Sequence, residues 1–121
     1  MKMYCYKKCS TCKKAAAFLR ERGSSFEEID YTEQPLSIEQ LRAYWQTSGL
    51  PLKKFFNTSG ILYREMGIKE RLLKMTEDEQ LELLSQYPML VKRPILVMKS
   101  AALVGFDETR WIEQLNKEDG L

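Results

Sequence analysis

The chain has 121 residues, of which 44% are hydrophobic and 30% are charged, and its formal net charge is +2. These values are typical of a single soluble globular domain. No segment approaches the about 20 apolar residues that a helix needs to cross a bilayer, and the small charge gives no reason to expect nucleic-acid binding.

The first thirty residues predict a strand, a helix and a second strand. Residues 1–6 form a short apolar run that is typical of a buried strand, and residues 11–22 have the apolar spacing of a helix that Gly23 would end. Imperfect alternation over 25–31 predicts the second strand. A strand–helix–strand unit of this length places its two strands parallel.

The middle of the chain predicts several short helices. Ser37 would cap a helix that runs to about residue 47, and Thr76 with Glu79 has the capping-box pattern of another helix. Further helical turns are predicted at 51–56, 61–66 and 69–74.

The C-terminal part predicts a hairpin and a last helix. Residues 93–98 and 102–104 are two apolar runs joined by a short link, and Asp107 would cap the helix that follows. Without the helical block, this element order is that of the thioredoxin fold. We therefore predict an α/β domain with a mixed four-stranded sheet, in which 1–34 and 91–121 form the core and 35–90 form a helical insertion.

The most informative motif, Cys9-Ser10-Thr11-Cys12, follows the first strand directly and opens the first helix. A C-x-x-C pair in this position has the geometry of a dithiol redox site, because the unpaired N–H groups and the dipole of a helix start stabilise a thiolate. We predict a reactive thiolate at Cys9, the earlier residue of the pair. Four lysines flank the motif: Lys7, Lys8, Lys13 and Lys14. They would add positive potential near the sulfurs, or they would simply form a basic face that is exposed to solvent.

Other uses of the cysteines have to be considered. A structural zinc site takes four Cys or His ligands, whereas the chain offers only one further cysteine, Cys5, and no histidine; we expect no metal. A bridge that closes so short a loop adds little stability, but two inert buried thiols remain an alternative. Cys5 is either a buried apolar residue of the first strand or a thiol near the site. The cysteine content and the absence of a signal-peptide pattern favour the cytoplasm.

Four parts of the chain together resemble the ArsC/Spx family of arsenate reductase-like thioredoxin-fold proteins. They follow the family's order and spacing: Cys9–Ala15, Phe55–Gly60 with Tyr63–Glu65, Pro88–Ile95, and Val104–Glu108. The resemblance implies that Cys9 is the nucleophile, which attacks arsenate in the reductases before glutathione and glutaredoxin resolve the adduct.

The resemblance also implies roles for three further residues. Thr11 matches a position that helps to hold an oxyanion at the helix N-terminus, Arg93 matches the anion-binding arginine, and Pro94 matches the cis-proline that faces the active site. Each residue also has an alternative without a functional role. Thr11 would be a hydroxyl in the first helical turn, Arg93 a solvated arginine at the start of a strand, and Pro94 a trans proline that opens an edge strand.

The chain also departs from the reductases. Cys5 stands where they carry a histidine, and of their three arginines only Arg93 is retained, since the other two positions fall near Asn57 and Gly105. Cys12 has no counterpart in the reductases. It resembles the Spx branch, whose C-x-x-C is a disulfide switch and whose members bind the C-terminal domain of the RNA polymerase α subunit.

Three hypotheses follow. The first is a thiol-dependent oxidoreductase of the glutaredoxin-coupled arsenate reductase type. In it Cys9 attacks, Cys12 resolves or acts as the switch thiol, and Arg93 holds the anion. Glutathione with glutaredoxin, or a thioredoxin-like reductant, would supply electrons without a bound cofactor. The second is an Spx-type redox-sensing transcriptional regulator that binds the RNA polymerase α subunit. The third is a thioredoxin-fold module without thiol chemistry. We expect no direct contact with nucleic acid or membrane.

Overall fold

The computed structural model describes residues 1–118, so the end of the predicted core segment, 119–121, lies outside the described residues. The elements in chain order are β1 (Lys2–Cys5), α1 (Ser10–Glu21), β2 (Glu27–Asp30), α2 (Ile38–Ser48), α3 (Ile61–Glu65), α4 (Ile68–Arg71), α5 (Glu77–Gln86), β3 (Ile95–Val97), β4 (Ala102–Val104) and α6 (Glu108–Glu118). Short 3₁₀ turns lie at Leu52–Phe55, Leu72–Lys74 and Pro88–Leu90. Among the described helices, none is long and apolar enough to cross a membrane.

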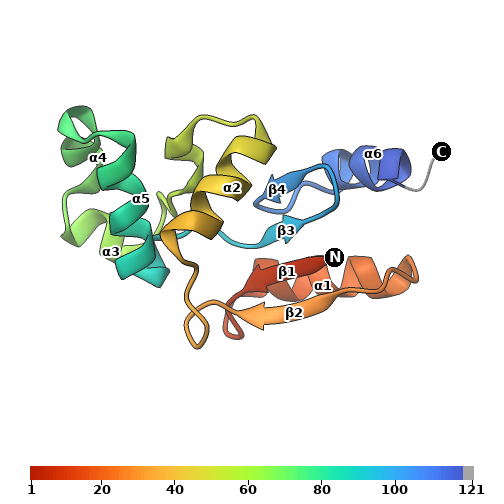
Figure 1. The fold of residues 1–121 in the computed structure, drawn as a ribbon. Coiled ribbons are helices and arrows are strands. Elements are labelled where there is room, and N and C mark those ends of the chain that lie inside the picture. Colours follow the sequence, from red (N-terminus) through yellow and green to blue (C-terminus); the bar gives the residue numbers. More distant parts are fainter. Residues whose placement is uncertain (119–121) are drawn as a thin grey trace.

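The sheet has the strand order β2-β1-β3-β4 (Figure 1). β1 and β2 are parallel, with Lys2 opposite Glu27. The pairs β1–β3 and β3–β4 are antiparallel, with Met3 opposite Leu96 and Leu96 opposite Leu103. The predicted mixed four-stranded sheet and its hairpin are therefore confirmed.

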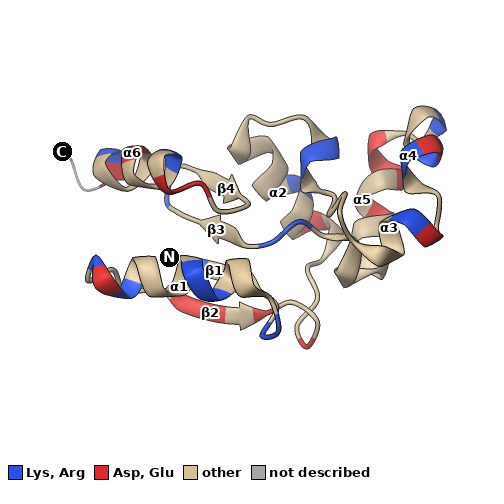
Figure 2. Cartoon of the chain, turned by 180° about the vertical axis from the view of Figure 1, so that it is seen from behind, with Lys and Arg blue, Asp and Glu red and all other residues tan. Residues whose placement is uncertain are grey.

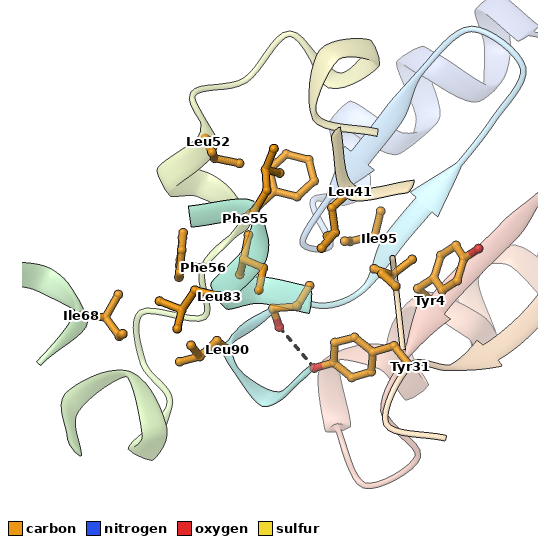
Figure 3. Close-up of a cluster of buried hydrophobic side chains, with 14 of the residues drawn as sticks. Tyr4, Tyr31, Leu41, Leu52, Phe55, Phe56, Ile68, Leu83, Leu90 and Ile95 are labelled. Atoms are coloured by element: carbon orange, nitrogen blue, oxygen red, sulfur yellow. Dashed lines mark hydrogen bonds between the residues drawn. The ribbon is translucent and has the colours of Figure 1, made fainter. Parts of the chain in front are cut away.

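The two faces of the sheet are covered by different helices. Met3 and Cys5 of β1 pack into a buried cluster with side chains of α1 and α6, including Leu19 and Trp111. Tyr4, which points to the other face, belongs to a second buried cluster built largely from the helical block. Figure 3 shows this cluster, whose side chains come from the sheet, α2, α5 and the turns between them. Because successive side chains of β1 point to opposite faces of the sheet, this strand contributes to both buried clusters.

Local sequence signals account for the ends of the longer helices. The Ser37 hydroxyl accepts a hydrogen bond from the backbone N–H of Gln40 at 3.1 Å, and the Thr76 hydroxyl accepts one from Glu79 at 3.1 Å. Both helices carry complete capping boxes. Gly49 ends α2 with a φ of 69°, a left-handed conformation that favours glycine.

A short backbone pairing joins the middle of the helical block to the segment where the chain leaves it. Phe56 forms an isolated antiparallel bridge with Val91, and the Asn57 N–H donates to the Leu90 carbonyl at 2.7 Å. α3, α4 and α5 gather beyond one end of the sheet (Figure 1). The division of the domain into a core and an insertion over 35–90 stays a prediction.

Candidate active site

Cys9 occupies the N-cap position of α1, just after the chain leaves β1. Its backbone is extended, with φ −94° and ψ 120°, and its Sγ accepts a hydrogen bond from the backbone N–H of Cys12 at 3.4 Å. The sulfur therefore satisfies one of the N–H groups that a helix start leaves unpaired. No acidic residue lies in the first turn of α1, so no side chain there opposes negative charge on this half-buried sulfur.

Cys9 opens onto a cleft of about 770 Å³ between the sheet and the helical block. Thr11, which is exposed, lies on the same wall as Cys9. Other walls come from the loop before α3, α3 itself, the segment before β3 and the turn after β4. The remaining lining residues are Asn57, Ser59, Gly60, Ile61, Leu62, Glu65, Met89, Lys92, Arg93, Val104, Gly105, Phe106 and Asp107.

Arg93 is fixed in this cleft by two tyrosines. Its Nη1 donates to the Tyr31 hydroxyl at 3.0 Å, and its guanidinium carbon lies 5.2 Å from the centre of the Tyr6 ring. The Tyr31 hydroxyl in turn donates to the Val91 carbonyl at 3.2 Å (Figure 3). Burial raises the pKa of Tyr31 to about 12, so this hydroxyl keeps its proton at neutral pH.

The guanidinium also interacts with the Cys9 sulfur. Burial works to lower the pKa of Arg93, but the interactions with Tyr31 and with Cys9 outweigh it and raise that pKa. Arg93 therefore stays charged and presents a cation to the cleft beside Cys9.

The Arg93–Pro94 peptide bond is cis, the isomer that the family resemblance implies. Pro94 is buried and is absent from the residues that line the cleft. Its carbonyl accepts a hydrogen bond from the Gly105 N–H at 2.8 Å. This bond holds the turn after β4 against the segment that carries Arg93.

The two positions that lack the family's other arginines both lie in the cleft. Asn57 and Gly105 line it together with Arg93. A Cβ at Gly105 would lie 3.3 Å from Lys92 Cε, so the Lys92 side chain passes over the glycine. The cleft thus gains a second cation that sequence reasoning missed, although its place next to Arg93 in the sequence was a usable signal.

The wall formed by the helical block is partly apolar. Ile61 is 67% exposed and Met89 is 37% exposed, and both line the cleft with Leu62. Glu65 and Asp107 add carboxylates at its edge. The sequence analysis gave none of these residues a role in the site, because they reach it only through the tertiary fold.

Cys12 lies behind Cys9 and away from the cleft. It is 3% exposed, and its thiol interacts with the thiols of both Cys9 and Cys5. The hydrogen bond with Cys5 and burial raise the pKa of Cys12. Cys5 is 7% exposed and donates its S–H to the Ile29 carbonyl at 3.7 Å. Cys5 therefore fits both interpretations from the sequence. It is a buried residue of β1, and it is also a thiol next to the Cys9–Cys12 pair.

The four lysines around the motif lie on the surface. All are exposed, and none is among the residues that line the cleft. The basic start of α1 is visible in Figure 2. Lys7 Nζ lies 3.3 Å from Glu33, in an exposed ion pair. Within residues 1–118, no group of three or more His, Cys, Asp or Glu side chains is arranged so that it could hold a metal ion.

The comparisons with known proteins agree with this geometry. The profile of the ArsC family matches residues 4–114. The chain belongs to the ArsC family. It is 52% identical over 110 residues to the uncharacterized protein YusI of Bacillus subtilis (strain 168), covering 91% of this chain and 93% of YusI.

Two further relatives represent the two branches that the sequence resembles. The global transcriptional regulator Spx of Enterococcus faecalis is 28% identical, and the match covers 88% of this chain and 79% of that protein. The crystal structure of a possible arsenate reductase from Streptococcus mutans UA159 superposes with a TM-score of 0.84 at 38% identity, covering 93% of this chain and 96% of the other. The thioredoxin-like α/β fold of this ArsC-family chain is therefore established.

Proposed function

We propose that the protein is a thiol-dependent oxidoreductase of the arsenate reductase type, with Cys9 as its nucleophile. One observation carries this proposal. The Cys9 sulfur accepts a hydrogen bond from the Cys12 N–H at the start of α1 and interacts with the Arg93 guanidinium, on the wall of an open cleft. A sulfur with these neighbours is placed to react as a thiolate and to receive an anionic substrate.

The reaction begins with attack of the Cys9 thiolate on the arsenic of arsenate, with loss of water. Arg93 and the N-terminus of α1, where Thr11 adds a hydroxyl, hold the remaining oxygens. Lys92 supplies a second cation at the cleft.

Cys12 then resolves the adduct. Its sulfur attacks the Cys9 sulfur, the sulfur–arsenic bond breaks, and its electron pair reduces arsenic(V) to arsenic(III), which leaves as arsenite. Two thiols of glutathione with glutaredoxin, or of a thioredoxin-like protein, reduce the Cys9–Cys12 disulfide. Because its raised pKa keeps Cys12 a thiol at neutral pH, this residue acts second. The glutathione- and thioredoxin-containing cytoplasm is the compartment in which such a cycle can run.

The test is arsenate turnover with reduced glutathione and glutaredoxin, compared between the wild type and the Cys9→Ser variant. We expect arsenite release by the wild type and none above background by Cys9→Ser. Absence of turnover in the wild type would contradict the arsenate assignment.

A second candidate function is that of an Spx-type regulator. It is favoured by the match to an Spx protein over 88% of the chain and by Cys12, which forms the C-x-x-C pair of that branch. In this role the Cys9–Cys12 disulfide would switch binding to the C-terminal domain of the RNA polymerase α subunit. Capture of that domain under oxidising and reducing conditions tests it, and no capture in either state would remove this candidate.

A further inference from the structure

Three thiols form a row that starts at the cleft with Cys9 and continues behind it with Cys12 and Cys5. Cys12 is the central one, since its thiol interacts with those of both Cys9 and Cys5. Its backbone N–H also donates to the Cys9 sulfur at 3.4 Å. Cys5 and Cys12 belong to the same buried cluster between the sheet and α1. The proposed function uses only two of these thiols.

Cys5 and Cys12 also share a second cavity, which is separate from the cleft of Cys9. Its volume is about 250 Å³, and it has no lining residue in common with that cleft. Besides the two thiols, its charged lining consists of Lys7, Lys13, Arg20 and Glu28. Because Lys7, Lys13 and Arg20 are exposed, a small reductant has an approach to these sulfurs that bypasses the substrate cleft.

We propose that Cys5 is a third redox-active thiol, which takes the disulfide over from Cys9 by attacking the sulfur of Cys12. The proposal rests on the proposed function, which supplies the Cys9–Cys12 disulfide. In this step the Cys5–Cys12 bond forms and the Cys9–Cys12 bond breaks. Cys9 leaves with the electron pair and receives the proton that Cys5 gives up. Cys5 is oxidised, Cys9 is reduced, and no other reagent is consumed.

The surroundings of the three sulfurs set the direction of this exchange. The Cys5 thiol interacts with the Cys12 thiol, and both side chains belong to one buried cluster and line one cavity, so Cys12 is the sulfur that it attacks. The departing Cys9 sulfur returns to the Cys12 N–H and the Arg93 guanidinium, and a donor and a cation beside a leaving thiolate assist its departure. Cys9 is thereby restored for another attack while the disulfide is held by two buried residues.

Peptide mapping can distinguish the two disulfides. Cleavage after lysine releases Cys5 on the peptide 3–7, whereas Cys9 and Cys12 share the peptide 9–13. The reduced wild type is oxidised with one equivalent of diamide, quenched in acid, alkylated and digested. We expect a disulfide between Cys5 and Cys12 to link peptides 3–7 and 9–13. We expect Cys9 to be free and therefore to carry the alkyl group. In Cys5→Ser and Cys5→Ala, we expect the disulfide to remain within peptide 9–13.

Two further variants complete the experiment. Met3→Leu changes the buried neighbour of Cys5 on β1 but keeps all three thiols, so it should form the linked peptides. Cys9→Ser cannot form the Cys9–Cys12 disulfide from which the exchange starts, so the linked peptides should be lost in this variant. Linked peptides that form as fast in Cys9→Ser as in the wild type would overturn the relay, as would a link through Cys9.

The failure of the relay also differs from the failure of the proposed function. A disulfide confined to peptide 9–13 in the wild type, with Cys5 alkylated, would overturn the relay and leave the Cys9–Cys12 chemistry intact. Three alkylated cysteines after oxidation would overturn both.

Discussion

The two walls of the cleft differ in how firmly their residues are held. On the sheet side, Cys9 is hydrogen-bonded to α1, and Arg93 is held by Tyr31 and Tyr6. On the helical side, α3 has no buried residue and no side-chain cap, and its Ile61 is 67% exposed. The reactive groups are therefore held by β1, α1 and the segment before β3, whereas access to them depends on the more exposed wall of α3. Substitutions on the two walls should have separable effects.

The largest effect is expected at the nucleophile. Cys9→Ser should abolish arsenite release, because a hydroxyl in this place is not ionised at neutral pH. Cys12→Ser should still form the first covalent adduct but stop there, which mass spectrometry of the intact protein can detect. An unchanged turnover in Cys9→Ser would show that the chemistry lies elsewhere.

A smaller effect is expected when the charge beside the sulfur is removed. Arg93→Met removes the cation beside Cys9, and we expect a severalfold slower reaction of Cys9 with iodoacetamide, because a nearby cation favours the reactive thiolate. Arg42→Met is the matched control, since Arg42 forms an exposed ion pair with Asp78 on the far helices. Equal rates in the two variants would contradict the role of Arg93.

The helical wall can be changed without touching the sulfur. A Cβ at Gly60 would lie 2.8 Å from Asn57 Nδ2, so Gly60→Ala should displace the Asn57 amide in the cleft. We expect a severalfold higher KM for the anionic substrate and an unchanged alkylation rate of Cys9. Thr58→Ala, in the same loop, changes an exposed residue that does not line the cleft and serves as the control. A slower alkylation in Gly60→Ala would show that the two walls are coupled.

The smallest effect is expected in the body of the helical block. Thr76→Ala removes the hydroxyl that caps α5 and should lower the free energy of unfolding by about 1 kcal/mol. Thr76→Ser keeps the oxygen and should retain most of this stability. Urea unfolding measures both, and the alkylation rate of Cys9 should stay the same in either variant.

Much of the fold could be predicted because its signals are local. Ser37 and Thr76 mark helix starts within four residues of sequence, and the alternation of β1 assigns Met3 and Tyr4 to opposite faces. The 3₁₀ turn at Pro88–Leu90 was missed, although proline is common at the first position of a helix.

The site could be predicted only in part. Cys9, Thr11 and Arg93 came from a motif and a family resemblance, and the structure brings all three to one cleft. Tyr31 could have been found, because the carboxyl ends of the parallel strands β1 and β2 lie at the same edge of the sheet. Ile61 could not, because its position depends on how the helical block packs.

The most direct test of the central claim is the alkylation rate of Cys9 at neutral pH, measured by peptide mapping in the folded protein and in the protein unfolded by urea. The N-terminus of α1 and Arg93 lie beside this sulfur only in the folded chain. We predict faster reaction in the folded protein even though Cys9 is half-buried there. An equal or slower rate would contradict the account of Cys9 as the activated nucleophile.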